Sequence, residues 1–183
     1  MSKVAVFFAK GFEEIEALTV VDLCRRAGID TDMVSVTGQD EVTGSHGICI
    51  RVDKRFENVD FEALDMLVLP GGGPGTQNLE AHEGLMKRVD EFGRAGKMVC
   101  AICAAPSILG HKGFLKGRRA CSFPSFESHL SEASVSRNSV EKDGNFITSR
   151  GMGTAFDFGL AIVEHICGKE KRDELARTTI YED

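Results

Sequence analysis

Short apolar runs alternate with helix-length amphipathic segments along most of the chain, and this alternation most constrains its fold. The runs occupy residues 3–9, 32–36, 65–69 and 98–102. Between them, residues 14–27 and 77–95 carry apolar side chains at helical spacing. Short apolar strands separated by helices are typical of a parallel sheet buried on both faces. We therefore predict an α/β fold, in which helices cover both faces of an open, doubly wound and mostly parallel sheet.

The second half of the chain predicts a small antiparallel addition to this sheet. Residues 139–148 have the pattern of two strands that turn at Asp143-Gly144, a dipeptide typical of hairpins. Residues 153–167 form the last long amphipathic helix of the prediction. Further short strands are expected at 47–52, as an edge strand or hairpin arm, at 119–123 and at 134–136. We expect a single domain over residues 1–183.

Composition and charge argue against several classes of protein. The 183 residues are 42% hydrophobic and 27% charged, as in soluble globular proteins, and the net charge is -6. A negative chain repels a phosphate backbone, so nucleic acid is not the expected partner. No apolar stretch approaches the ~18 residues of a membrane span, and the chain enters its first strand without a signal segment. We therefore expect a cytoplasmic protein that binds neither nucleic acid nor membrane.

Cys103 is the first candidate for chemistry. It ends an apolar strand and is followed by small residues, a proline and a helix-like segment. A strand that turns sharply into a helix is the geometry of a nucleophile elbow, which exposes the corner side chain. The nearby helix N-terminus favours the thiolate. The alternative is a small buried hydrophobe, because free cysteines are often buried.

Cys100 and Cys103 form a C-x-x-C pair, which has other interpretations. A zinc site would need a second pair of ligands at a similar spacing, and the sequence has none. A redox dithiol would need both sulfur atoms in the first turn of a helix, whereas Cys100 lies inside the predicted strand. Neither interpretation is favoured.

The glycine-rich run at residues 70–75 follows a predicted buried strand. It lacks both the G-K-[ST] of a Walker loop and the spacing of a dinucleotide fingerprint, so nucleotide binding is not expected. Glycine instead allows backbone N–H groups to approach a reacting atom closely. The N–H groups of Gly72 and Ala104 would then form an oxyanion hole beside Cys103.

Glu16 is the candidate proton carrier. Glu13, Glu14 and Glu16 open the first helix, where helix capping is the simplest role for acidic residues. Glu16 differs because apolar residues surround it and no cation lies at helical spacing, which predicts a raised pKa. A cysteine–histidine dyad is not evident, because none of the five histidines adjoins Cys103.

Six motifs together resemble the ThiJ/PfpI superfamily, in particular its branch related to the Parkinson-disease-associated deglycase. They span nearly the whole chain in the family's order. The motifs are AKGFEEIE (9–16), VDLCRRAG (21–28), LPGGGPGTQNL (69–79), AICAAP (101–106), VEKDG (140–144) and TSRGMGTAFDFGLAIV (148–163).

The resemblance implies a flavodoxin-like homodimer with an elbow cysteine beside a buried, protonated glutamate. These are Cys103 and Glu16 by position, and no metal or organic cofactor is implied. Members are described as glutathione-independent glyoxalases, as deglycases acting on methylglyoxal adducts, and as redox-responsive chaperones. The expected partner is a small dicarbonyl or glycated substrate. The alternative is a redox sensor in which Cys103 is oxidised and turnover is negligible.

Three positions depart from the family pattern. Phe123 stands where several members have a histidine near the cysteine, and Met152 replaces a common proline. Ala104 replaces the histidine that follows the nucleophile in the proteolytic branch, which argues against a peptidase. We expect Gly73, Phe123, Gly151 and Met152 to line the substrate pocket.

Overall fold

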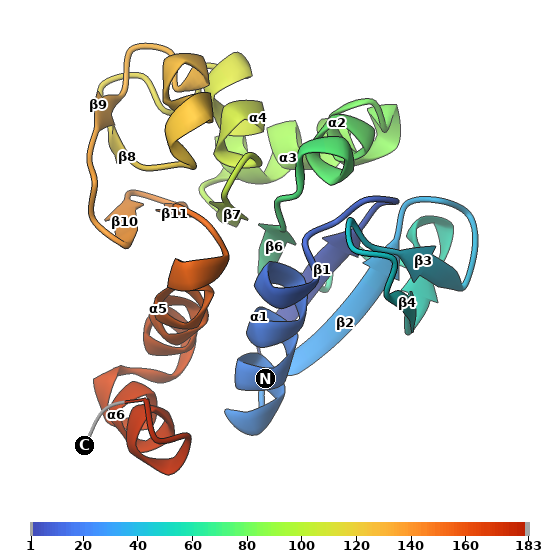
Figure 1. Ribbon diagram of the computed structural model, residues 1–183, viewed down its shortest axis with the longest axis horizontal. Helices are drawn as coiled ribbons and strands as arrows, with labels where there is room; N and C mark the ends of the chain where they lie inside the picture. Colours follow the sequence, from blue (N-terminus) through green and yellow to red (C-terminus); the bar gives the residue numbers. More distant parts are fainter. Residues whose placement is uncertain (1, 182–183) are drawn as a thin grey trace.

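Helices cover both faces of a central sheet in the computed structural model, which describes residues 2–181 (Figure 1). The strands are β1 (Lys3–Phe8), β2 (Asp30–Ser35), β3 (Glu41–Thr43), β4 (Cys49–Arg51), β5 (Lys54–Arg55), β6 (Met66–Leu69), β7 (Met98–Ile102), β8 (Arg119–Ala120), β9 (Ser134–Val135), β10 (Val140–Asp143) and β11 (Phe146–Ser149). The α-helices are α1 (Glu14–Arg26), α2 (Gly73–Glu80), α3 (Glu83–Ala95), α4 (Pro106–His111), α5 (Ala155–Cys167) and α6 (Lys169–Thr178). Short 3₁₀ helices are η1 (Phe56–Asn58), η2 (Pro124–His129) and η3 (Met152–Thr154).

The main sheet has the strand order β10-β11-β7-β6-β1-β2-β5. All its neighbouring pairs are parallel except β10 with β11, which form the hairpin predicted at Asp143-Gly144. The segment at 47–52 contributes a hairpin arm, because β4 pairs antiparallel with β3 in a separate small sheet. The predicted mostly parallel α/β fold with a small antiparallel addition is therefore confirmed.

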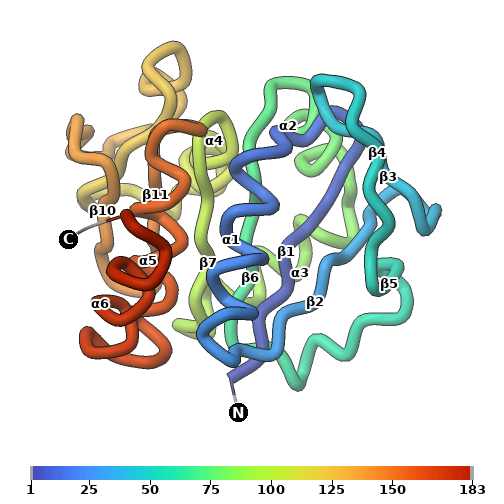
Figure 2. Tube along the Cα trace, turned by 60° about the horizontal axis from the view of Figure 1, so that its bottom comes forward, coloured from blue at the N-terminus to red at the C-terminus, as the bar shows by residue number. Residues whose placement is uncertain are grey.

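Alternate residues of each central strand face opposite cores. On one side, Val4 and Val6 of β1 pack with α1, α5 and α6; on the other, Ala5 and Phe7 pack with residues of α3 and α4. Figure 2 shows α1 and α5 lying side by side over the sheet. Both cores are apolar, which explains why the central strands have continuous apolar sequences.

One helix prediction was wrong in detail. The single helix expected at 77–95 is divided into α2 and α3, because the His82 side chain caps α3 by accepting from the Leu85 N–H at 3.0 Å. The helix expected at 153–167 is α5, and the shorter α6 that follows it, which buries Leu175 and Ala176, was not predicted. Among residues 2–181, no helix is long and apolar enough to cross a membrane.

The chain changes direction between β1 and β6, which lie side by side at the centre of the sheet. From β1 it moves outward to β2, and it later returns to β6 on the other side of β1. Loops that follow two such strands separate and leave a crevice at the carboxyl edge of the sheet. The loop after β1, the glycine run after β6 and the turn after β7 all lie at this edge.

Candidate active site

Cys103 is the corner residue between β7 and α4. Its φ of +66° lies in the left-handed region, which is strained for a residue with a side chain. Backbone hydrogen bonds hold the corner in place: the Cys103 N–H donates to Ser149 O at 3.0 Å, and its carbonyl accepts from the Phe123 N–H at 2.9 Å. The predicted elbow is therefore present, with the thiol half-buried. Cys100 lies fully buried inside β7, and its thiol is free.

Glu16 reaches the same corner from the first turn of α1. It is 1% exposed, and its carboxyl lies beside the Cys103 side chain and raises the pKa of the thiol. The Gly71 N–H donates to Glu16 Oε2 at 3.0 Å. Sequence analysis did not select Gly71 as a site residue. In the structure, a Cβ at this position would lie 2.4 Å from Glu16 Oε2 and 2.5 Å from Cys103 Cβ. The glycine run was the available signal, but it does not indicate which glycine meets the carboxylate.

Two backbone N–H groups complete the surroundings of the sulfur atom. Those of Gly72 and Ala104 both act to lower the pKa of the Cys103 thiol. Gly72 precedes α2 with a φ of +88°, and a Cβ at this position would lie 2.4 Å from Gly11 O. The structure thus brings together the four residues selected for catalysis: Cys103, Glu16, Gly72 and Ala104.

The pKa of the Cys103 thiol is shifted in the direction opposite to the one predicted from the sequence, whereas the pKa of Glu16 is shifted as predicted. Burial raises the pKa of Cys103 to about 12, the Glu16 carboxylate acts in the same direction, and the two N–H groups oppose them. The direction of this shift is opposite to the expected preference for thiolate, because burial and a neighbouring carboxylate disfavour the charged sulfur. Burial also raises the pKa of Glu16 to about 7, as predicted. Glu16 is therefore placed to accept the thiol proton when the sulfur attacks.

Backbone contacts between the loops fix the site. The Glu13 N–H donates to Gly71 O at 3.0 Å, and the Gly75 N–H donates to Gly11 O at 3.0 Å. These bonds join the loop after β1 to the loop after β6. The glutamate and the N–H donors are therefore held relative to each other before any substrate binds.

The four residues expected in the pocket lie in different surroundings. A Cβ on Gly151 would be 3.5 Å from Phe123 Cδ2 and 4.0 Å from Glu16 Oε1, so Gly151 and Phe123 adjoin the site. Gly73 is exposed in the first turn of α2. Met152 is 56% exposed and lines a neighbouring cavity of about 310 Å³ with Ile15 and Ile48. A role for these four residues in substrate binding remains a prediction.

Glu13, Glu14 and His46 form a cluster beside the site that sequence reasoning did not find. Their ligand atoms lie within 4.8 Å of one another, and His46 Nδ1 is 3.0 Å from Glu14 Oε2. Although burial opposes the shift, hydrogen bonds from His46 and Ser45 lower the pKa of Glu14 to about 2. Capping was expected for Glu14, but this carboxylate instead ties α1 to the turn between β3 and β4.

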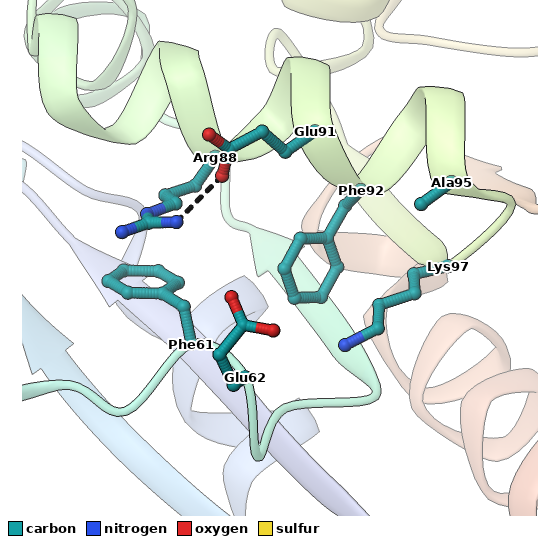
Figure 3. A pocket seen from close by; sticks show the side chains of 7 residues that line it. All are labelled: Phe61, Glu62, Arg88, Glu91, Phe92, Ala95 and Lys97. Carbon is teal, nitrogen blue, oxygen red and sulfur yellow. Dashed lines mark hydrogen bonds and ion pairs between the residues drawn. The ribbon is translucent and has the colours of Figure 1, made fainter.

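Another cavity, of about 250 Å³, lies at the opposite edge of the sheet (Figure 3). The Arg88 guanidinium stacks on the Phe61 ring at 4.6 Å and pairs with Glu91 at 2.7 Å. Lys97 Nζ donates to Leu64 O at 2.8 Å. These cations already have partners, and the cavity is remote from Cys103 because it lies where β6 and β7 begin.

Comparison with known proteins identifies the family. The model of the DJ-1/PfpI family matches residues 2–165. The chain belongs to this family. It is 39% identical over 182 residues to the protein dj-1beta of Drosophila melanogaster, covering 97% of this chain and 96% of that protein. It is also 31% identical to a deglycase of Pyrococcus abyssi, covering 84% of this chain and 93% of that one.

Structural comparison agrees with this assignment. The structure of oxidized Toxoplasma gondii DJ-1 superposes with a TM-score of 0.95 at 31% identity, and each chain is covered completely. The Arabidopsis thaliana DJ-1 homologs B and A are longer: at 36% and 35% identity, the match covers 95% and 94% of this chain but 40% and 45% of theirs. Family membership thus agrees with the resemblance inferred from the sequence motifs.

Proposed function

We propose that the protein is a cysteine-dependent glyoxalase and deglycase acting on methylglyoxal or its early adducts on thiols and amines. The observation that carries this proposal is the Cys103 sulfur at the strained corner, where the Glu16 carboxyl and the N–H groups of Gly72 and Ala104 all act on its pKa. This arrangement supplies a nucleophile, a proton carrier and donors for a developing oxyanion. The deglycase of Pyrococcus abyssi is a relative that supports the same class of activity.

In the glyoxalase reaction, Cys103 attacks the aldehyde carbon of methylglyoxal. Glu16 accepts the thiol proton as the carbon–sulfur bond forms and returns it to the new alkoxide, which gives a neutral hemithioacetal. The carboxylate then moves a proton from this carbon to the neighbouring one through an enediol, leaving a lactoyl thioester on Cys103. Water hydrolyses the thioester to lactate and restores the thiol.

Glu16 is the ionisable side chain that acts on the pKa of Cys103. The proposed mechanism therefore assigns no proton transfer to a histidine. Phe123, in the position of the histidine of several family members, is 46% exposed beside Gly151. An aromatic ring here offers an apolar wall to the methyl group of methylglyoxal and no proton transfer. Both proton steps are therefore assigned to Glu16.

We also propose that the protein acts as a homodimer in the cytoplasm. Ile15, Ile48 and Met152 are each at least 50% exposed around one cavity next to the site. A group of large apolar side chains on one face is typical of an interaction surface. This supports association of two copies, as the family resemblance implies.

The proposal is tested by lactate formation from methylglyoxal without glutathione, with Cys103 kept reduced. Wild type is expected to form lactate, and Cys103→Ser is expected to lose at least 100-fold in rate, because the hydroxyl is a far weaker nucleophile. Cys49→Ser, which removes an exposed thiol on β4, is the matched control and should keep the wild-type rate. Equal rates in wild type and Cys103→Ser would refute the activity.

A redox sensor with negligible turnover is the second candidate function. The half-buried sulfur has hydrogen-bonding partners that would also hold the oxygens of a sulfinate, and one structural neighbour is an oxidized DJ-1. Mass spectrometry after mild peroxide treatment tests this candidate. Selective gain of two oxygens at Cys103 with no lactate formation would favour the sensor; uniform oxidation of all exposed thiols would contradict it.

A further inference from the structure

Three side chains meet at the far ends of the segments that begin at the active site. Glu80, His111 and His129 are the last residues of α2, α4 and η2, respectively. Glu80 Oε1 lies 2.6 Å from His111 Nδ1, and His111 Nε2 lies 2.9 Å from His129 Nδ1. The proposed function uses none of these residues.

The carboxylate determines which nitrogen of His111 is free. An ionised Glu80 accepts the Nδ1 proton of His111, so Nε2 of the neutral ring carries a lone pair. In that tautomer, the lone pair can accept the Nδ1 proton of His129, whose Nδ1 lies 2.9 Å away. A carboxylate behind the imidazole is also the usual arrangement for histidines that bind metals, because it fixes the tautomer and makes the ring a better donor.

The spacing of the two ring nitrogens suits a shared ion. Two nitrogen ligands at about 2.0–2.1 Å from one ion lie roughly 2.9–3.4 Å apart, depending on the angle between them. The His111 and His129 nitrogens are 2.9 Å apart, and their rings are inclined at 71°. The His111 side chain is 40% exposed, so water can supply the remaining ligands.

The backbone holds the two histidines close together. Gly110 packs so tightly that a Cβ there would lie 2.0 Å from His129 O. The Phe126 ring lies against the His129 ring, with centroids 5.7 Å apart. The pair is therefore placed by its surroundings, which lowers the entropic cost of binding.

The ligand atoms distinguish this site from the cluster of Glu13, Glu14 and His46. That cluster offers two carboxylates and one imidazole, whereas His111 and His129 offer two imidazoles. Two imidazoles select a first-row transition metal over Mg²⁺ or Ca²⁺, which prefer oxygen ligands.

We propose that His111 Nε2 and His129 Nδ1 together bind a divalent transition-metal ion such as Zn²⁺, with Glu80 orienting His111. The ion takes the place of the Nδ1 proton of His129, which moves to Nε2 of the same ring. Two metal–nitrogen bonds replace the hydrogen bond between the rings, and the ion releases two of its water ligands. This site is independent of the proposed chemistry at Cys103.

Calorimetric titration with Zn²⁺, and visible absorption with Co²⁺, test the site in the full chain. Wild type and Cys103→Ser should each bind one ion per chain at this site, because the elbow thiol is not a ligand. His111→Ala and His129→Ala should weaken binding at least 10-fold, and Glu80→Gln should weaken it about 10-fold. His165→Ala is the matched control, an exposed histidine that contacts Lys142 and should not change binding.

Two results would overturn the proposal. One is a His111→Ala protein that binds Zn²⁺ as tightly as wild type. The other is a loss of binding with His46→Ala or Cys103→Ser, which would put the ion at another cluster. Because a variant can also lose its fold, imidazole NMR of the wild type provides an independent test. Zn²⁺ should shift the signals of His111 and His129 together, and movement of other histidines alone would contradict the site.

Discussion

At the scale of single residues, the close contact between Cys103 and Glu16 requires a glycine, Gly71, next to the pair. Gly71 touches both side chains of the pair, so a methyl group there must displace one of them. A methyl group on Gly153, an exposed glycine in η3, would meet no other atom within 4 Å. The two glycines therefore offer a matched comparison.

We predict that Gly71→Ala lowers turnover of methylglyoxal about 100-fold, because displacement of a catalytic group by about 1 Å costs this much. Gly153→Ala should retain the wild-type rate. Steady-state lactate formation measures both. If Gly71→Ala keeps full activity, the contact between the glycine and the catalytic pair is not required.

The buried carboxyl also makes stability depend on pH. Burial raises the pKa of Glu16 from 4.5 to about 7, so between these values the folded protein holds a proton that the unfolded chain releases. Stability from this group is therefore complete below pH 4.5 and is lost as the pH rises through 7. The cost above pH 7 is about 3 kcal/mol.

Glu16→Gln removes this charge. We predict that the free energy of unfolding of Glu16→Gln, relative to wild type, rises by about 3 kcal/mol between pH 4.5 and pH 8. Urea unfolding at the two pH values measures the change. Glu170→Gln, at an exposed carboxyl on α6, is the control and should show little change. A difference that does not vary with pH would contradict a raised pKa.

At the scale of elements, the sequence predicted those with strong apolar periodicity and missed several polar ones, among them β3, β5 and α6. The strands β1, β6 and β7 are fully apolar where they cross the sheet, and each was predicted to within a few residues. Helix α6 is mostly charged, and its buried residues are Leu175 and Ala176 alone, so apolar spacing gave little signal. The cap formed by His82 is also hard to predict, because histidine is not a usual N-cap residue.

The contribution of α6 can be measured directly. Leu175 is 4% exposed and belongs to the same core as α1 and α5. We predict that Leu175→Ala lowers the free energy of unfolding by about 3 kcal/mol, as expected for a buried leucine. Denaturant unfolding checks this, with the exposed Arg177→Ala as control. A loss below about 0.5 kcal/mol would mean that α6 is not part of the cooperative core.

At the scale of the whole molecule, the topology explains how a site could be predicted from distant motifs. Residues 9–16, 70–75 and 101–106 converge because their strands are parallel neighbours that end at one edge of the sheet. Their backbone contacts were not predictable: the bond from Gly71 to Glu16 and the burial that raises the pKa of Cys103 depend on the packed loops. The pairs of Glu14 with His46 and of His111 with His129 join segments far apart in sequence, and no local pattern indicates them.

The central claim is that Glu16 carries the protons for chemistry at Cys103. Its most direct test is the rate of lactate formation from methylglyoxal by Glu16→Gln, measured beside wild type and Cys103→Ser at equal protein concentration. Glutamine keeps the shape of the side chain but cannot accept a proton, so we predict a loss of at least 100-fold. Full turnover in Glu16→Gln would contradict the mechanism.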